Sequence, residues 1–258
     1  MVKVALLQLR LQETKQGETI INHIIKLLKK LGDVNLDIVC LPELWYSKPI
    51  NNFEKEFKMI IDIAKEQSLI IIPGAFLETI NGNLHISSPV IASDGLIMGR
   101  QFKIHPFADE RNAIKTGTKL ETFDFGGGGR FKFGIAICYD VVFPEVSRAL
   151  ARKGADIIFF PSRIRNEGIK PWHMYVHVRA LENRIAAAAP NVSSNIYGGK
   201  SIVIGFDYHK KSDIAIPKPV IASSVKQQIL VTDVDLELAR KIRKTRLEDF
   251  KGDLYSSL

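Results

Sequence analysis

The chain has 258 residues, of which 46% are hydrophobic and 25% charged. This composition excludes a disordered or fibrous protein and supplies a large core without disulfide bonds, so we expect a single globular domain over 1–258. The formal net charge of +8 suits an anionic partner, but much of it lies between 240 and 246, in a helical pattern with an apolar stripe. We interpret this segment as a solvated helix face and expect no nucleic-acid binding, since no helix-turn-helix, zinc-finger or aromatic RNA-binding pattern accompanies it.

Two cysteines, Cys40 and Cys138, allow at most one disulfide, which a domain of this size does not need. We therefore expect two reduced thiols in a cytoplasmic protein. The first residues run into Gln8 and Arg10 without a small-residue cleavage site, which predicts that there is no secretory signal. No apolar run approaches membrane-spanning length, so we also expect no membrane association.

The first part of the chain alternates strands and helices. Short apolar runs predict buried strands, and apolar residues three and four apart predict amphipathic helices. We expect strands at 2–9, 36–41 and 69–72, and helices at about 21–32 and 52–67. Pro42 ends the second strand and places Glu43 in the loop at its carboxyl end. The aromatic pair Trp45 and Tyr46 then lines either a pocket or the core.

An antiparallel meander follows this alternation. Strand-like runs at 75–79, 84–91 and 96–102 are joined by Asn-Gly-Asn and Ser-Asp-Gly turn signals. Lys103 comes directly after the last of these strands. From 105 to 125 there is little periodicity, and the run Gly126–Gly129 closes this long loop. The run lacks the Gly-Lys-Ser/Thr of a phosphate site, so we interpret it as a turn.

The stretch 133–145 combines a strand, a tight loop and the start of a helix. An apolar run leads into Cys138, and Pro144 opens a helical pattern that ends at Gly154. Active-site residues of α/β sheets lie in the loops at the carboxyl ends of the strands, and Cys138 is in such a loop. It also lies near the start of a helix, whose dipole favours the thiolate form of a nucleophilic cysteine. The alternative is a buried cysteine that only packs. A strand at 155–160, ended by Pro161, completes a βαβ unit.

Another helix is predicted from Pro171 towards 189, ended by Pro190. In it, His173 and His177 are four residues apart, as in a zinc-binding helix, but Met174 stands where the zinc-protease motif has a glutamate, so we expect no metal. Strands at 201–206, 220–223 and 228–234 and the basic helix complete the chain.

Glu43, Lys103 and Cys138 each follow a predicted strand, and together they supply the parts of nucleophilic catalysis. A thiol needs a base, and the oxyanion formed when it attacks a carbonyl needs positive charge or hydrogen-bond donors. On spacing alone, acidic and basic residues after strands usually only solvate loops. A papain-like pair with His105, His173, His177 or His209 is the alternative hydrolase, although no local signature of that chemistry is present.

The three residues stand in three distinctive blocks, Leu-Pro-Glu-Leu-Trp at 41–45, Gly-Arg-Gln-Phe-Lys-Ile-His at 99–105 and Gly-Ile-Ala-Ile-Cys-Tyr-Asp at 134–140. These blocks closely resemble the signature blocks of the nitrilase superfamily of carbon-nitrogen hydrolases, in the family's order, and the resemblance extends to 143–145, 179–183 and 231–236. It implies a four-layer α-β-β-α sandwich, a Glu-Lys-Cys triad, no cofactor, and a homodimer or larger homo-oligomer. Glu110, seven residues after Lys103, matches a second glutamate of the family; the alternative is a solvated loop acid beside Arg111.

The resemblance implies a cysteine-dependent amidase that acts on small-molecule amides through a thioester. Under this hypothesis Glu43 takes the Cys138 proton, and Lys103 with the backbone N–H of Tyr139 holds the oxyanion. Ser162, Arg163 and Arg165 follow a neighbouring strand, and an arginine there suits an acidic substrate such as an ω-amide of a dicarboxylic acid. The alternative is that these arginines are solvated or lie at a subunit contact. Nitrilase and N-carbamoyl amidohydrolase activities, and a non-catalytic scaffold, remain open.

Overall fold

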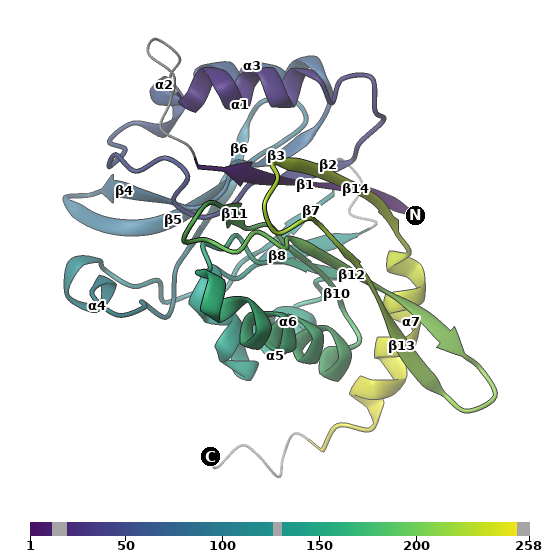
Figure 1. Ribbon diagram of the computed structural model, residues 1–258. Coiled ribbons are helices and arrows are strands. Elements are labelled where there is room, and N and C mark those ends of the chain that lie inside the picture. Colours follow the sequence, from purple (N-terminus) through teal and green to yellow (C-terminus); the bar gives the residue numbers. More distant parts are fainter. Residues whose placement is uncertain (12–19, 126–130, 252–258) are drawn as a thin grey trace.

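The protein is described by a computed structural model that covers residues 1–11, 20–125 and 131–251 (Figure 1). The predicted turn at Gly126–Gly129 lies outside these residues. Both cysteines are free thiols. Within the described ranges, no helix has the length and apolar character needed to cross a bilayer.

The first sheet has eight strands, in the order β11-β1-β2-β3-β5-β4, with β14 paired to β1 and β6 paired to β5. Strands β1, β2 and β3 run parallel, whereas β4, β5 and β6 form the antiparallel meander predicted from the turn signals. The bounds are β1 Val2–Arg10, β2 Ile38–Cys40, β3 Ile70–Ile72, β4 Phe76–Ile80, β5 Asn83–Ile91, β6 Ile97–Phe102, β11 Val192–Ser193 and β14 Gln228–Val234.

The second sheet has six strands, in the order β13-β12-β10-β9-β8-β7. The central strands β8, β9 and β10 are parallel, and the outer strands are antiparallel to their neighbours. The bounds are β7 Thr122–Asp124, β8 Lys132–Ile135, β9 Ile157–Phe159, β10 Ala186–Ala189, β12 Ile202–His209 and β13 Ile214–Ile221.

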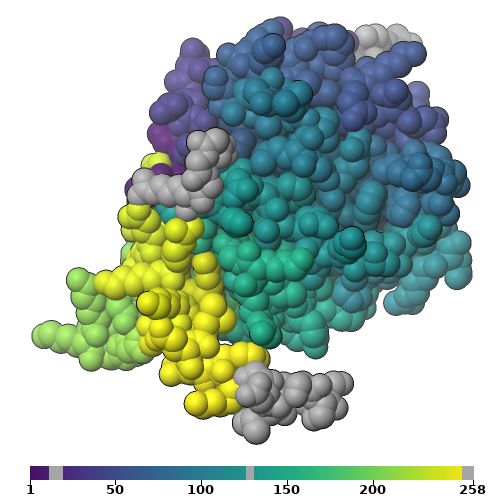
Figure 2. Space-filling model, turned by 180° about the vertical axis from the view of Figure 1, so that it is seen from behind, coloured from purple at the N-terminus to yellow at the C-terminus, as the bar shows by residue number. Residues whose placement is uncertain are grey.

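Helices cover the outer faces of both sheets, which gives the expected four-layer α-β-β-α sandwich (Figure 1). One apolar cluster lies between the sheets and contains Leu6 and Phe159, and two others join the helices to the outer faces. The first sheet carries α1 Ile20–Lys29, α2 Phe53–Glu56 and α3 Lys58–Glu66; the second carries α5 Pro144–Arg152, α6 Ile169–Asn183 and α7 Leu236–Glu248. The β12–β13 hairpin and α7 project from the same side of the molecule (Figure 2).

Two predicted helices differ from the observed ones. The helix predicted at 52–67 is divided into α2 and α3 at Phe57, whose side chain is buried. The helix predicted towards 189 ends instead at Asn183, because Arg184 takes a left-handed conformation with φ 45°. The alanines after it form the fully buried strand β10 between β9 and β12, so tertiary packing overrides the helix propensity of alanine.

The second sheet also contains elements that the sequence pattern missed. The strand predicted at 220–223 is the end of the longer β13, which pairs with β12 along its length. The stretch 105–125 contains the short helix α4 Glu110–Ala113 and the strand β7. Strand β13 is an edge strand with two prolines, which hides it from a simple alternation pattern.

Candidate active site

Glu43 is held in the turn that follows β2. Its backbone N–H donates to the Ser162 carbonyl at 3.2 Å, and its side chain is 3% exposed. Gly74 lies against this turn with φ 103°, and a Cβ there would come within 2.1 Å of the Pro42 carbonyl oxygen. The close approach of these two strand ends therefore requires glycine and fixes the position of the carboxylate.

Lys103 follows β6 and is bonded to two carboxylates. Its Nζ lies 2.8 Å from Oε1 of Glu43 and 2.8 Å from Oε2 of Glu110. The Lys103 side chain is 1% exposed, whereas that of Glu110 is 25% exposed. The backbone N–H of Phe107 donates to Glu110 Oε2 at 2.7 Å, which fixes this carboxylate toward the ammonium. The structure thus places Glu110 against Lys103, unlike a solvated loop acid.

Cys138 is the first residue of the 3₁₀ helix η1, Cys138–Val142. Only Ala136 and Ile137 separate this helix from the end of β8. Its φ of 49° is a left-handed conformation that is uncommon for a residue with a Cβ. The backbone N–H of Cys138 donates to the Pro161 carbonyl at 2.9 Å, which holds the turn. The thiol is hydrogen-bonded to the Glu43 side chain and accepts from the Arg163 backbone N–H. The three residues predicted from separate strand ends therefore meet at one point.

The protonation states of these groups follow from burial and from their neighbours. Burial raises the pKa of the Cys138 thiol well above its usual range, and the Glu43 carboxylate acts in the same direction, while Lys103 opposes both. Burial also raises the pKa of Glu43, against the opposing charge of Lys103. For Lys103, burial would lower the pKa, but the charges of the Glu43 and Glu110 carboxylates hold it above its usual range.

The resting site therefore holds a neutral thiol beside a charged ammonium. The expectation that a helix dipole favours the Cys138 thiolate is wrong for this state, because burial and the adjacent Glu43 carboxylate outweigh it. The thiol has to pass its proton to a base as it reacts, and Glu43, already hydrogen-bonded to it, is placed for that transfer.

A cavity of about 300 Å³ opens at the sulfur of Cys138. Tyr139 and Arg163, two of the predicted substrate-binding residues, line it, as does Arg165. Ser162 is buried, its hydroxyl donates to the Phe160 carbonyl at 2.8 Å, and it is not among the residues that line the cavity. The remaining lining residues are Phe107, Val141, Val142, Ile164, Glu167, Gly168, Pro171, Trp172 and Tyr175.

Two of the lining residues each contain a buried hydrogen-bond donor that has no acceptor among the described residues. These donors are Nε of Arg163 and Nε1 of Trp172. The Arg163 guanidinium carbon lies 4.6 Å from the centre of the Tyr197 ring, which supports the side chain from one side. Because both nitrogens are buried, a ligand in the cavity reaches them only after these side chains shift.

The aromatic residues after Glu43 belong to the core. Trp45 is 4% exposed, packs edge-on against Phe57 and Phe76, and donates from Nε1 to the Pro73 carbonyl at 2.7 Å. Trp172 and Tyr175, by contrast, were not singled out from the sequence, although they line the cavity. The sequence feature that could have identified them is the predicted helix that follows β9, because the start of that helix lies near the carboxyl ends of the strands.

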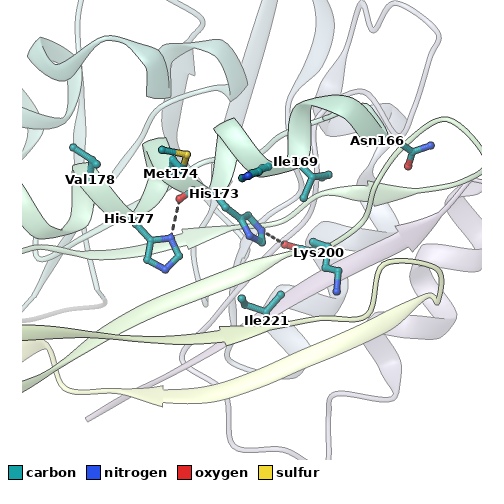
Figure 3. A pocket seen from close by; sticks show the side chains of 9 residues that line it. Asn166, Ile169, His173, Met174, His177, Val178, Lys200 and Ile221 are labelled. Carbon is teal, nitrogen blue, oxygen red and sulfur yellow. Dashed lines mark hydrogen bonds between the residues drawn. The ribbon is translucent and has the colours of Figure 1, made fainter.

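The histidines of the papain-like alternative are bonded elsewhere. His105 Nδ1 lies 2.9 Å from Asp140, and His209 Nδ1 lies 2.6 Å from the Ser212 hydroxyl. In a second, open groove, His173 Nε2 contacts the Lys200 carbonyl at 2.7 Å and His177 Nδ1 contacts the His173 carbonyl at 2.8 Å (Figure 3). No histidine is among the residues that line the cavity at Cys138.

A thiol hydrogen-bonded to a carboxylate, with an ammonium beside them, at the strand ends of a four-layer sandwich defines a cysteine hydrolase of the nitrilase superfamily. The chain belongs to the carbon-nitrogen hydrolase family, whose model matches residues 3–244. It is therefore a carbon-nitrogen hydrolase by family, as the resemblance of its three blocks implies.

Individual relatives cover nearly the whole chain. A nitrilase from Pyrococcus abyssi is 29% identical, with 98% of this chain and 97% of the relative covered. The omega-amidase NIT2 from Mus musculus is 24% identical, with 98% and 96% covered. The solved structure of a carbon-nitrogen hydrolase from Helicobacter pylori G27 matches with a TM-score of 0.80 and 23% identity over 98% of this chain and 97% of that one.

Proposed function

We propose that the protein hydrolyses small amides to a carboxylic acid and ammonia through a thioester on Cys138. The observation that carries the proposal is the meeting of the thiol, the Glu43 carboxylate and the Lys103 ammonium at the end of one cavity. Glu43 accepts the thiol proton as the sulfur attacks the amide carbon. Lys103 and the backbone N–H of Tyr139 stabilise the oxyanion that forms.

The second half of the reaction uses the same carboxyl group. Glu43 returns its proton to the departing nitrogen, which leaves as ammonia, and the acyl group stays on sulfur as a thioester. The carboxylate of Glu43 then takes a proton from water, and the resulting hydroxide displaces the thiolate from the acyl carbon. The thiolate recovers that proton, which restores the resting site.

The cavity wall supports an acidic substrate, such as the ω-amide of a small dicarboxylic acid. Arg163 lines the cavity with its Nε unpaired, and Trp172 adds a second unpaired N–H donor. A carboxylate at the far end of the substrate pairs with the Arg163 guanidinium, whose charge and forked donors suit it. The similarity to a mouse omega-amidase points to the same substrate class. Arg165 is the weaker candidate, because its Nε is paired with Glu167 at 3.0 Å and its side chain is 63% exposed.

Ammonia release from a panel of substrates tests the proposal. The panel contains neutral amides, ω-amides of dicarboxylic acids, nitriles and N-carbamoyl compounds, with Cys138→Ala as the control variant. We expect turnover of amides, highest for the acidic ones, and none by the Cys138→Ala protein. Equal turnover by that variant would contradict the mechanism, and a folded protein inactive on the whole panel would favour the non-catalytic scaffold.

A second pair of variants tests the acidic anchor. We expect Arg163→Met to raise KM for an acidic amide about 10- to 100-fold, the loss of a charged hydrogen bond, while KM for a neutral amide of the same length changes little. Arg165→Met is the matched control at the same cavity. An unchanged KM for acidic amides in the Arg163 variant would exclude this anchor.

The nitrilase alternative is supported by the Pyrococcus abyssi relative and uses the same nucleophile. Attack of the thiolate on a nitrile carbon forms a thioimidate, so the negative charge develops on nitrogen and not on oxygen. The thioimidate then takes up one additional water molecule before ammonia leaves. Turnover of the nitriles in the panel therefore distinguishes nitrilase from amidase activity. Turnover of the N-carbamoyl compounds identifies N-carbamoyl amidohydrolase activity in the same way.

We also infer that the protein forms a homo-oligomer. Helix α6 presents Met174, Val178 and Leu181 on one stripe, where they are 62%, 48% and 42% exposed, and the first two line an open groove together with Ile221 of β13 (Figure 3). Such an apolar face is typical of a subunit contact. We expect Val178→Glu to lower the molar mass in solution, measured by light scattering. Leu96→Glu, at a separate exposed leucine, is the control; a monomeric unmodified protein would contradict the inference.

A further inference from the structure

The Asp140 carboxylate is a buried acceptor that joins the two loops of the candidate site. It is 0% exposed and accepts from the Ile137 backbone N–H at 2.9 Å on one oxygen. On the other oxygen it accepts from the His105 backbone N–H at 2.8 Å and faces His105 Nδ1 at 2.9 Å. One side chain thus binds the backbone of two segments that are more than thirty residues apart in the chain.

These two segments carry the nucleophile and the ammonium. Ile137 immediately precedes Cys138, and His105 lies two residues after Lys103. A further bond, from the Ile104 backbone N–H to Asp140 Oδ2 at 3.4 Å, joins the same two segments, so the Asp140 bonds help to set the position of the sulfur relative to Nζ. A shift of about 1 Å in such an arrangement costs on the order of 100-fold in rate.

The nucleophile turn needs such support because it is strained. Cys138 has φ 49°, and left-handed conformations of residues with a Cβ persist only where surrounding contacts hold them. The bond from Ile137 to Asp140 closes this turn on one side, and the bond from Cys138 N–H to the Pro161 carbonyl closes it on the other. Without the Asp140 carboxylate, the turn keeps only its backbone bonds, from Cys138 N–H to the Pro161 carbonyl and from Asp140 N–H to the Ile137 carbonyl at 3.0 Å.

His105 completes the connection with its ring. The ring stacks on Phe143, the residue that ends η1, with 3.6 Å between ring centres and an interplanar angle of 14°. The ring thus contacts the nucleophile segment twice, through Nδ1 on Asp140 and through its face on Phe143. Its side chain is 31% exposed, so it can be replaced without opening a core cavity.

We propose that Asp140 and His105 are positioning residues, a clasp that holds the Cys138 turn in register with Lys103 during the reaction. Neither touches the substrate in this account: Asp140 acts through the backbone of Ile137 and His105, and His105 acts through Asp140. The inference rests on the proposed roles of Cys138 and Lys103, and its test includes a reaction of the thiol that needs no amide turnover.

The test compares three substitutions of His105. His105→Phe keeps a ring to stack on Phe143 but removes the donor, whereas His105→Asn removes the ring but carries an N–H donor on the same Cγ. His105→Ala removes both. Each variant is measured for kcat and KM on the best amide of the panel, for the rate of Cys138 alkylation by iodoacetamide at one pH, and for thermal stability.

We expect His105→Phe and His105→Ala to lower kcat and the alkylation rate about 10- to 100-fold, the effect of one hydrogen bond to a charged group, with KM within about twofold. His105→Asn restores most of both rates. Asp140→Asn, which keeps the shape and loses one acceptor oxygen, lowers both about 100-fold. A loss of stability alone would move neither rate at temperatures where the variants are folded.

Wild-type kcat and alkylation in His105→Phe would overturn the proposal, as would an Asn variant no faster than the Phe variant. If Asp140→Asn does not fold, the His105 series decides. If no amide is turned over, the alkylation rates of Cys138 in the variants still test whether Asp140 and His105 position the thiol. Failure of the proposed function and failure of this inference therefore give different results.

Discussion

The substitution Glu110→Gln isolates the charge of the second carboxylate. Glu110 Oε2 lies 2.8 Å from Lys103 Nζ and accepts from the Phe107 backbone N–H at 2.7 Å. Glutamine has nearly the same shape and keeps one carbonyl oxygen as an acceptor, so the change removes the negative charge with little rearrangement. The side chain is only 25% exposed, so water screens this charge incompletely.

The magnitude follows from the bond that is weakened. Glutamine still accepts a hydrogen bond from the ammonium, so the substitution removes the charge–charge part of the interaction. Charge-assisted hydrogen bonds contribute about 1–1.5 kcal/mol more than neutral ones, which corresponds to a decrease of about 5- to 13-fold in kcat if the bond is needed when Lys103 holds the oxyanion. KM changes less, because Glu110 is not among the residues that line the cavity.

The pH profile gives a second, opposite signal. Catalysis needs Glu43 as a carboxylate, so the rate falls as the pH decreases through the pKa of Glu43, which is raised above 4.5 by burial, with Glu110 also acting to raise it. Removal of the Glu110 charge lowers that pKa. We therefore expect the acid limb of kcat/KM in Glu110→Gln to move to lower pH while the maximum rate decreases.

Steady-state ammonia release between pH 4 and 9 measures both quantities. Asp109→Asn is the matched control, because Asp109 is an exposed carboxylate next to Glu110 in the same loop and its side chain makes no cap hydrogen bond. An acid limb that moves to higher pH, or a kcat equal to that of the control, would refute the reasoning that Glu110 acts on the site through its charge.

Three other predictions concern the supports of the site and its thiols. Gly74→Ala places a methyl group 2.1 Å from the Pro42 carbonyl oxygen, so we expect steady-state kinetics to show a decrease in kcat of about 100-fold as the turn moves. Asp156→Asn breaks a buried ion pair with the C-terminal helix and lowers the free energy of unfolding in urea by about 3–5 kcal/mol. Because the Asp156 pKa is lowered from 3.8, this difference is full above that pH and decreases below it. Iodoacetamide modifies Cys138, faster as the pH rises, and spares Cys40, which is 0% exposed with a strongly raised pKa; peptide mass spectra identify the modified thiol.

The positions of the reactive side chains were predictable from local sequence. Apolar runs that end at Pro42, before Lys103 and at Cys138 identify the carboxyl ends of three strands, and such ends gather at one edge of α/β sheets. The meander was predictable from its turn signals. The four-layer arrangement was predictable from the three blocks that resemble the superfamily. All of these depend on patterns within about ten residues.

The features that sequence reasoning missed depend on contacts across the fold. Nothing local shows that the four alanines of β10 fill the space between β9 and β12, where a helix does not fit. The protonation state of Cys138 depends on burial and on a carboxylate from β2, which a helix-dipole argument does not include. Ser162 follows the right strand, but its hydroxyl is used by the Phe160 carbonyl, a detail of rotamer and backbone direction.

The proposed mechanism explains why one ammonium is bonded to two carboxylates. Before reaction, Glu43, Glu110 and Lys103 carry one net negative charge and the thiol is neutral. Transfer of the thiol proton to Glu43 moves the negative charge to sulfur without changing the total, so a buried site can accommodate it at low cost. At that moment Lys103 loses its ion pair with Glu43, and burial alone would lower its pKa. The thiolate and the Glu110 carboxylate together then keep Lys103 charged. Glu110 takes no part in the proton transfer and keeps its charge after the sulfur has bonded to carbon, and this is the reason that its charge affects kcat.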